Sequence, residues 1–431
     1  MDLSPPEPPR RPSGSSHRRA VARLGLIVLI TSVFLAGILT GEVVGPGSTD
    51  ASSSISDQPG FGTLQQVWDL IHDKFADPSA VDDEALLYGA AHGMVASLGD
   101  TGHSTFLDPD EATAFRAALS GELVGLGISI EYQDGEPVIV APIKDSPAEE
   151  AGLLPGDVIV EIDGIPTLGM TDAEVTMHLR GDAGTPVTLT IERDGVSDLL
   201  QITVVRALID LDPVTWAMLP NGVALVQLHE FSADSGKQLN EALKEVVAGG
   251  ATGIVLDLRN NPGGLVSEAL TVASQFMPEG TTVYIQKDRD GDESPVDTIG
   301  NDGAALDVPL VVLVNRASAS AAEMIAGSLR DNGRAEVIGE RTYGTGTVVS
   351  TFSLDGGSAL ALGTSFWLTP DGDLAWKVGV APDVEIRQTD PDAIIDIIDG
   401  ETVSQTQLDA SGDTQLLGAL AALRDEETPR C

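Results

Sequence analysis

The sequence has very few cysteines and few basic residues. Its single cysteine is the last residue, Cys431, which excludes an internal disulfide framework and a zinc site built from cysteines. Only 24 lysines and arginines stand against 66 aspartates and glutamates, so the formal net charge is −42 at pH 7. Such a chain repels a phosphate backbone and offers it no basic stripe. We therefore expect no nucleic-acid partner.

Two kinds of catalytic spacing are also missing. The sequence lacks the paired carboxylates of glycosidases and has no His-x-x-x-His metal spacing. We therefore expect no required metal and no cofactor. What is present is 42% hydrophobic residues, with 47 glycines and 25 prolines, in 431 residues. This composition predicts a turn-rich globular body with room for roughly three domains.

The N-terminal segment is predicted to place the rest of the chain outside the cytoplasm. Residues 1–23 hold arginines among prolines and serines, which is typical of a disordered cytoplasmic tail. Residues 24–41 carry no charge and nearly span a bilayer core of roughly 30 Å. Because arginines precede this segment, the positive-inside rule sends the following chain across the membrane. An uncleaved transmembrane anchor and a cleaved signal segment remain open, and residues 42–62 form a flexible linker.

Two regions of different pattern follow the linker. Residues 63–118 are predicted to form a helical leader, with helices over 63–75 and 84–97 and a cap at Asp82. Residues 119–206 consist of short alternating strands and one helix, which predicts a β-rich domain. The expected elements of this domain are strands at 127–132, 138–141, 158–162, 187–192 and 201–205 and a helix at 171–179.

The second half of the chain predicts an α/β core. Over residues 207–388, continuous apolar strands alternate with amphipathic helices, which indicates a partly parallel sheet covered on both faces. The expected elements are strands at 223–228, 253–258 and 309–314 and helices at 235–249, 265–276 and 319–330. Residues 389–431 are an acidic and mostly polar C-terminal segment, with one short packed helix expected at 415–423.

The β-rich region resembles a PDZ domain. Gly125, Leu126, Gly127 and Ile128 stand where that family has its carboxylate-binding loop, and residues 146–157 match its most recognisable segment. A glycine-rich turn presents successive amides as an anion nest, while the neighbouring strand edge accepts an extended peptide. The resemblance implies a groove for the C-terminal tails of proteins. Taken alone, the four-residue loop is equally typical of an ordinary turn.

Two segments at strand ends in the core carry candidate chemistry. Residues 257–264 (Asp-Leu-Arg-Asn-Asn-Pro-Gly-Gly) end in glycines that allow a tight turn, whose amides would stabilise an oxyanion. Residues 314–323 place Ser320 at the start of a helix, where a nucleophile would have an exposed hydroxyl near the helix dipole. The simpler alternative is a serine that only caps the helix.

In this order and behind a PDZ-like region, these segments resemble the carboxyl-terminal processing peptidases, or tail-specific proteases. The resemblance covers about residues 63–388 and includes the turn at 99–105 and the segments at 333–335, 339–344, 368–370 and 379–383. It implies a serine endopeptidase with Ser320 as nucleophile. It also implies that Gly263, Gly264 and the Ala321 amide are the oxyanion donors.

The sequence departs from this family at the general base. The family has Gly-Lys-Gly where this chain has Gly344, Thr345 and Gly346, and the glutamine that supports the lysine falls on Val349. A threonine hydroxyl cannot act as a base near neutral pH. The sequence therefore predicts either a substitute base or a loss of catalysis.

Two residues are candidates for a substitute base. His103 lies in the leader turn, and Lys377 lies after the Thr-Pro turn; the simpler alternatives are a turn-stabilising histidine and a surface lysine. Glu323 and Glu340 could orient a base, or could serve only as a helix-dipole or surface partner. We therefore predict a membrane-anchored, extracytoplasmic serine endopeptidase that acts on protein tails. The alternative is a catalytically inactive relative that serves as a peptide-binding scaffold or receptor.

Overall fold

A computed structural model of the chain describes residues 55–58, 60–100, 104–133, 136–143, 146–170, 172–193, 195–196, 198–210, 212–300, 303–390, 393–395, 397 and 402–426. The predicted tail at 1–23 and membrane segment at 24–41 lie outside this part of the chain. Among the described residues, no helix has both the length and the apolar character to cross a membrane. The membrane anchor therefore stays a prediction.

The core is built on a six-stranded sheet with the order β10-β11-β12-β15-β16-β19. The strands from β11 to β19 are parallel, and only β10 is antiparallel to its neighbour. Their bounds are β10 (Val214–Met218), β11 (Val223–Leu228), β12 (Gly253–Asp257), β15 (Leu310–Val314), β16 (Glu336–Gly339) and β19 (Val384–Glu385). The predicted parallel sheet is confirmed, and the carboxyl ends of its strands meet at one edge.

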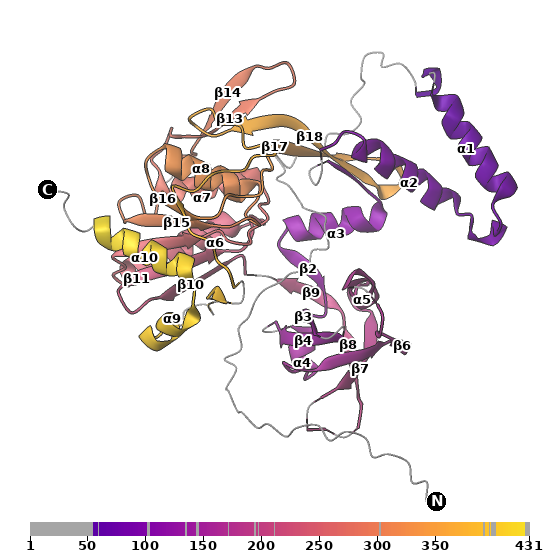
Figure 1. Ribbon diagram of the computed structural model, residues 1–431, viewed down its shortest axis with the longest axis horizontal. Helices are drawn as coiled ribbons and strands as arrows, with labels where there is room; N and C mark the ends of the chain where they lie inside the picture. Colours follow the sequence, from indigo (N-terminus) through magenta and orange to yellow (C-terminus); the bar gives the residue numbers. More distant parts are fainter. Residues whose placement is uncertain are drawn as a thin grey trace, which may run out of the picture.

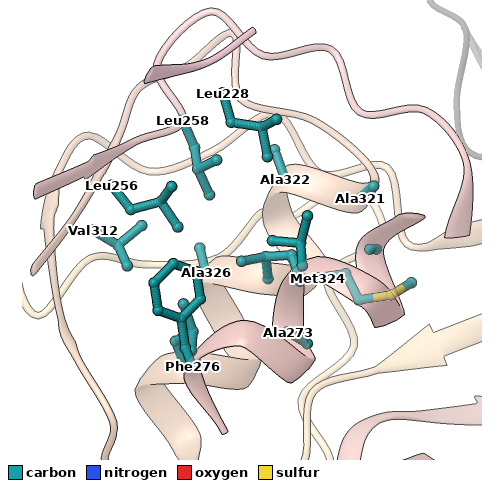
Figure 2. Close-up of a cluster of buried hydrophobic side chains, with 14 of the residues drawn as sticks. Leu228, Leu256, Leu258, Ala273, Phe276, Val312, Ala321, Ala322, Met324 and Ala326 are labelled. Atoms are coloured by element: carbon teal, nitrogen blue, oxygen red, sulfur yellow. The ribbon is translucent and has the colours of Figure 1, made fainter. Parts of the chain in front are cut away.

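Three helices cover one face of this sheet: α6 (Ser235–Ala248), α7 (Val266–Phe276) and α8 (Ala321–Asp331). Successive residues of a strand point to opposite faces. Leu256 and Val312 point to the face that these helices cover and pack in the same apolar cluster. Figure 2 shows both side chains beside Phe276 of α7 and the alanines of α8. The small alanine side chains let α8 pack closely on the strands of the sheet.

The C-terminal segment covers the opposite face of the same sheet. It forms α9 (Gln405–Ser411) and α10 (Thr414–Glu426), which lie against the core in Figure 1. Leu416 and Leu420 of α10 pack with Leu225 and Val255 of the sheet. The expected short helix at 415–423 is therefore confirmed in a longer form, whereas α9 was not predicted.

A buried ion cluster fastens this C-terminal segment to the core. The Arg259 guanidinium donates from Nε to Asp257 Oδ1 at 2.9 Å and from Nη1 to Asp413 Oδ1 at 2.8 Å. All three side chains are at most 3% exposed. Arg259 directly precedes the glycine-containing turn at 260–264, so Asp413, the residue before α10, helps to hold the start of that turn.

A second sheet joins the leader to the core. Its order is β1-β18-β13-β14, with β17 also paired to β18. The bounds are β1 (Thr105–Leu107), β13 (Thr282–Lys287), β14 (Glu293–Asp297), β17 (Thr347–Ser353) and β18 (Ala359–Leu368). The sequence analysis did not predict this sheet, because its strands are far apart in the chain and their pairing is set by the tertiary fold.

The described part of the leader contains three α-helices: α1 (Phe61–Lys74), α2 (Asp83–Ala96) and α3 (Pro109–Leu119). The first two confirm the predicted helices, and the Asp82 side chain accepts from the amides of Glu84 and Ala85 as a cap should. None of the residues of α1 and α2 is buried. Figure 1 shows α1 standing away from the rest of the chain.

The PDZ-like region has its own sheet and core. The strand order is β3-β4-β5-β7-β8, with β6 paired to β5, and Ile139, Ile159 and Leu189 are buried at its centre. The strands β2 and β9 pair with each other where the chain enters and leaves this region. The bounds are β2 (Glu122–Gly125), β3 (Ile128–Gln133), β4 (Glu136–Pro142), α4 (Pro147–Glu150), β5 (Val158–Ile162), β6 (Ile165–Pro166), α5 (Asp172–Leu179), β7 (Pro186–Glu192), β8 (Leu200–Val205) and β9 (Ala207–Asp210).

The ion cluster predicts a strong effect of the substitution Asp413→Asn. Removing one carboxylate leaves Arg259 buried with a single charged partner, and breaking a buried pair in this way costs about 3 to 5 kcal/mol. We expect urea unfolding to show a loss of this size. The control is Asp409→Asn, since this exposed carboxylate accepts a hydrogen bond from the exposed Gln405 of the same helix α9. Equal stability of the two variants would contradict the anchoring role of Asp413.

Candidate active site

Three loops meet at the carboxyl edge of the parallel sheet. They follow β12, β15 and β16 and cover residues 258–264, 315–320 and 340–346. The Ala319 amide donates to the Asn261 carbonyl at 2.9 Å, and the Tyr343 amide donates to the Ser318 carbonyl at 3.0 Å. The glycine turn, the serine segment and the segment containing Thr345 therefore lie side by side, as the sequence analysis expected for the first two.

Ser320 lies at the start of α8 in an unusual backbone conformation. Its φ is 53° and its ψ is −117°, a region that non-glycine residues rarely occupy and that is often found at functional sites. The residue is only 3% exposed, so the expected exposed hydroxyl is wrong. The neighbouring loops cover it.

The other serine of this segment has a structural role. Ser318 is fully buried, and its hydroxyl donates to the Leu258 carbonyl at 2.7 Å. The same oxygen accepts from the Asn315 amide at 2.9 Å. Ser318 thus ties the loop after β15 to the end of β12, which leaves Ser320 as the candidate nucleophile.

The glycine turn packs directly against Ser320. Gly263 has φ +98°, and a Cβ there would lie 2.6 Å from Ser320 Cβ and 2.9 Å from the Ala321 nitrogen. At Gly264, with φ +142°, a Cβ would lie 2.4 Å from the Phe231 carbonyl oxygen. Neither position has room for a side chain, so glycine is required for the turn to reach the serine.

The amides of this turn have different partners. The Gly263 amide donates to Asn261 Oδ1 at 2.8 Å, so the expectation that Gly263 serves as an oxyanion donor does not fit this geometry. Asn261 is itself held by its Nδ2, which donates to the Leu228 carbonyl. No described residue accepts a hydrogen bond from the amides of Gly264 or Ala321. These two expected donors remain available for an oxyanion.

Glu323 is a buried carboxylate that accepts hydrogen bonds from Ser320 and from the loop after β16. The residue is fully buried, and its Oε2 accepts from the amides of Ser320 at 2.9 Å and Thr345 at 2.8 Å. Its Oε1 accepts from the Gly344 amide at 2.7 Å and from the Thr342 hydroxyl. A surface role for Glu323 is therefore wrong, and the carboxylate instead joins the serine to the loop after β16.

The other flanking glutamate lies at the edge of the site. Glu340 Oε1 is 2.9 Å from Nε of the exposed Arg316. This pairing agrees with the simpler expectation for Glu340, that of a charged partner rather than a group that orients a base.

Thr345 lies against the backbone of the candidate nucleophile. Its side-chain oxygen accepts from the Ser320 amide at 3.1 Å, and the residue is 1% exposed. Val349 is equally buried on β17, in an apolar cluster with Leu107 and Phe115 of the leader. The position expected for the lysine therefore adjoins the serine, whereas the position expected for the glutamine makes apolar contacts.

The two candidate bases differ in what the structure says of them. His103 lies outside the described residues. Lys377 is exposed, and its Nζ donates to the Gly99 carbonyl at 3.0 Å and lies 4.2 Å from the centre of the Trp376 ring. Its amide also donates to the Gly344 carbonyl at 2.8 Å. Lys377 thus connects the leader turn with the loop that contains Thr345.

Two titratable residues at the end of β11 were missed by the sequence analysis. Burial lowers the pKa of His229, which the charge of Asp257 only partly opposes, and burial raises the pKa of Glu230. The following residue, Phe231, donates from its amide to the Gly263 carbonyl at 2.8 Å. The available signal was their position directly after a buried strand, at the edge where ligands bind in such sheets.

The expected peptide-binding loop joins β2 to β3. Gly125 ends β2 and Ile128 begins β3. The Leu126 carbonyl accepts from the Ala148 amide at 2.8 Å, and the Gly127 carbonyl accepts from the Ser146 hydroxyl at 3.1 Å. Because the N–H and C=O of a trans peptide point in opposite directions, the next amides, of Gly127 and Ile128, face away from these partners.

The sequence matches known proteins in both regions. The profile of peptidase family S41 matches residues 222–386, and that of the PDZ domain matches residues 138–193. The chain is 35% identical over 370 residues to the carboxy-terminal processing protease CtpA of Bacillus subtilis (strain 168), covering 85% of this chain and 78% of that protein. It is 38% identical over 330 residues to the carboxyl-terminal-processing protease of Synechocystis sp., covering 75% and 76%.

A solved structure shares the fold. A putative S41 protease from Bacteroides fragilis NCTC 9343 superposes with a TM-score of 0.53 at 20% identity, covering 88% of this chain and 98% of that structure. At this identity the likeness concerns the architecture alone.

The contact of Gly263 with Ser320 predicts that Gly263→Ala disables the site. The added methyl group would displace Ser320 and the Ala321 amide, and losing an aligned oxyanion donor costs on the order of 100-fold or more in turnover. We expect at least this loss of peptide hydrolysis. The control is Gly280→Ala, where φ is +78° but nothing lies within 4 Å of the added carbon. It should cost about 1 kcal/mol in stability and keep the activity; equal activity of the two variants would contradict the role of Gly263.

The partly buried carboxyl of Glu230 predicts a pH-dependent stability. Its raised pKa means that the folded protein binds a proton that the unfolded chain releases, so stability falls as pH rises through the folded pKa. Glu230→Gln removes the loss of stability that ionisation of this carboxyl causes in the folded protein. We expect the variant to melt at a higher temperature than the wild type at pH 8 and at the same temperature near pH 4. The control Glu241→Gln, at an exposed position of α6, should leave the melting temperature unchanged at both pH values. A lower melting temperature for Glu230→Gln than for the wild type at pH 8 would contradict the raised pKa of Glu230.

Proposed function

The chain belongs to peptidase family S41, as a carboxyl-terminal processing serine protease with a PDZ domain, and we propose that it cleaves proteins near their C-terminal ends on the outer side of a membrane. The observation that carries the proposal is the direct packing of Gly263 on Ser320. This contact brings a backbone turn, a helix N-terminus and a serine to one point.

In the proposed reaction, Ser320 Oγ attacks the carbonyl carbon of the scissile peptide bond and loses its proton to a base. The amides of Gly264 and Ala321 stabilise the oxyanion. The leaving amine takes up a proton, which leaves an acyl group on Ser320, and water then hydrolyses this ester. The helix dipole of α8 adds to the stabilisation of negative charge at this end.

The base in this proposal is not residue 345. Thr345 occupies the position that the resemblance assigns to the lysine, and Val349 occupies that of the glutamine. Glu323 does not serve either, because its two oxygens already accept four hydrogen bonds. His103 and Lys377 therefore remain the proposed candidates.

The proposed substrates are proteins with free C-terminal tails. The PDZ domain would hold the tail at the loop formed by Gly125, Leu126, Gly127 and Ile128, where successive amides bind a carboxylate and β3 offers a strand edge. The adjoining segment of the tail would then reach Ser320. Support comes from the inward-facing carbonyls of this loop.

The proposed location follows from the N-terminal sequence. Arginines precede an uncharged stretch at 24–41, which favours a cytoplasmic tail, a transmembrane anchor and a catalytic body outside the cytoplasm. A cysteine introduced after the apolar stretch tests the proposed orientation. We expect Ser48→Cys, in a chain that also carries Cys431→Ser, to react on whole cells with a thiol reagent that cannot cross the membrane. Labelling only after the cells are broken would contradict the proposed orientation.

A second candidate function is that of an inactive relative that binds peptides as a scaffold. The observation that favours it is the pair Thr345 and Val349, neither of which supplies a base. Both candidates share the PDZ groove, so peptide binding alone does not separate them.

The decisive experiment measures cleavage of an unfolded protein with a free C-terminal tail by the detergent-solubilised full chain. We expect the wild type to release peptides and Ser320→Ala to lose at least about 10³-fold of the rate. The control Ser267→Ala removes an exposed hydroxyl from α7 and should retain full activity. If the wild type and Ser320→Ala both bind the tail and neither cleaves it, the scaffold function replaces the peptidase function.

A second set of variants identifies the base. We expect His103→Ala or Lys377→Ala to lower kcat by about 10³-fold or more while KM changes little, because a base acts in the transition state. Lys377→Arg separates the two roles of Lys377, since arginine keeps a donor for the Gly99 carbonyl but cannot give up its proton. Unchanged rates in both alanine variants would eliminate both candidates.

A further inference from the structure

A cavity of about 600 Å³ opens on the carboxyl edge of the sheet and concentrates arginines. Arg316, Arg341 and Arg387 all line it, together with Glu340, Glu385 and Tyr343. The three arginines come from three different loops of the core. In a chain with only 24 basic residues and a net charge of −42, this grouping on one cavity stands out from the acidic remainder.

The pairing of these arginines leaves positive charge in the cavity. Arg316 pairs with Glu340 at 2.9 Å, and Arg387 pairs with Glu385 at 3.1 Å. Arg341 forms no ion pair with any described residue, and its Nη1 donates to the Gly379 carbonyl at 3.2 Å. A guanidinium has five N–H donors in a planar fork that fits a carboxylate. Donors of Arg341 are therefore left over for an anionic group.

The cavity wall is hydrogen-bonded to the segment that carries Ser320. Arg316 lies in the loop between β15 and Ser320, and the Tyr343 amide donates to the Ser318 carbonyl at 3.0 Å. Thr342, which also lines the cavity, donates from its hydroxyl to Glu323, and Glu323 accepts from the Ser320 amide. These contacts place the cavity beside the segment that carries Ser320.

We propose that this cavity is a carboxylate-binding subsite for the polypeptide whose backbone lies at Ser320, with Arg341 as its principal donor. The subsite takes an acidic side chain near the scissile bond, whereas the free terminal carboxylate is assigned to the PDZ loop. This inference rests on the proposed function, since it assumes that a polypeptide lies along this edge. It adds a selection for acidic groups to the tail recognition assigned to the PDZ domain.

The net charge of the whole chain predicts weaker binding of acidic peptides, whereas the subsite predicts tighter binding, so the two can be told apart by experiment. At −42 the protein as a whole repels acidic peptides more than neutral ones. Preference for an acidic peptide therefore requires a local cationic site. Close hydrogen bonds outweigh the diffuse repulsion because salt screens charges beyond about 10 Å at 0.1 M.

The experiment measures binding of dye-labelled peptides by fluorescence anisotropy to the detergent-solubilised full chain carrying Ser320→Ala. Three peptides are compared: one with two glutamates near its end, one with glutamines in their place, and the glutamate peptide with an amidated C-terminus. We expect the first to bind about tenfold more tightly than the second, which corresponds to roughly 1.4 kcal/mol. The amidated peptide lacks the carboxylate that the PDZ loop is proposed to bind, so its affinity is compared between the Ser320→Ala chain with and without Arg341→Gln. We expect Arg341→Gln to weaken the amidated peptide as much as the free one, and no weakening of the amidated peptide would contradict a subsite for acidic side chains.

Matched arginine variants then test the site. We expect Arg341→Gln to bring the ratio of the two affinities close to one, and Arg341→Lys to retain part of it. Arg387→Gln changes a different loop of the cavity and should also lower the ratio of the affinities for the glutamate and glutamine peptides. It therefore tests the subsite even if Arg341→Gln does not fold. The control Arg289→Gln removes an exposed arginine between β13 and β14 and should leave the ratio unchanged.

Two results would overturn the subsite. The first is equal affinity of the Ser320→Ala chain for the glutamate and the glutamine peptide. The second is an equal loss of affinity for these two peptides when Arg341→Gln is added. Neither result depends on hydrolysis. A chain that prefers acidic peptides but never cleaves them keeps the subsite and loses the proposed activity. A chain that cleaves both peptides alike, with equal affinity, keeps the activity and loses the subsite.

Discussion

The close approach of Gly263 to Ser320 is the constraint on which the candidate site depends. The contact requires a residue without a side chain at position 263, a positive φ at both residues, and two loops that end neighbouring parallel strands. Parallel pairing of β12 and β15 supplies the last condition, because their carboxyl ends lie at the same edge. The chemistry proposed for Ser320 builds on this geometry, since Gly263 brings the turn against Ser320 and the Ala321 nitrogen.

Glu323 extends this constraint to the third loop. A buried carboxylate is costly unless its oxygens are satisfied, and here four donors from Ser320, Thr342, Gly344 and Thr345 satisfy it. The same carboxylate therefore fixes the serine backbone and the loop that lies beside it. These hydrogen bonds hold the loop after β16 next to Ser320.

The second support of the site comes from the end of the chain. Asp413 and Asp257 hold Arg259 from two sides, and Arg259 directly precedes the glycine turn. The C-terminal helices thus complete the core and also brace the turn that reaches Ser320. The composition of residues 389–431 alone, acidic and mostly polar, does not reveal this role.

The sequence by itself determined the periodic elements and the glycine-containing turns, because helix and strand periods and turn chemistry are local properties. The helices at 61–74 and 83–96, the strands at 223–228 and 253–257, and the order of the strand-end segments were all predictable in this way. The tertiary structure alone decided the burial of Ser320, the capture of the Gly263 amide by Asn261, the partners of Glu323 and the pairing of the second sheet. Each of these depends on contacts between segments distant in the chain, and no local pattern encodes which distant residues will meet.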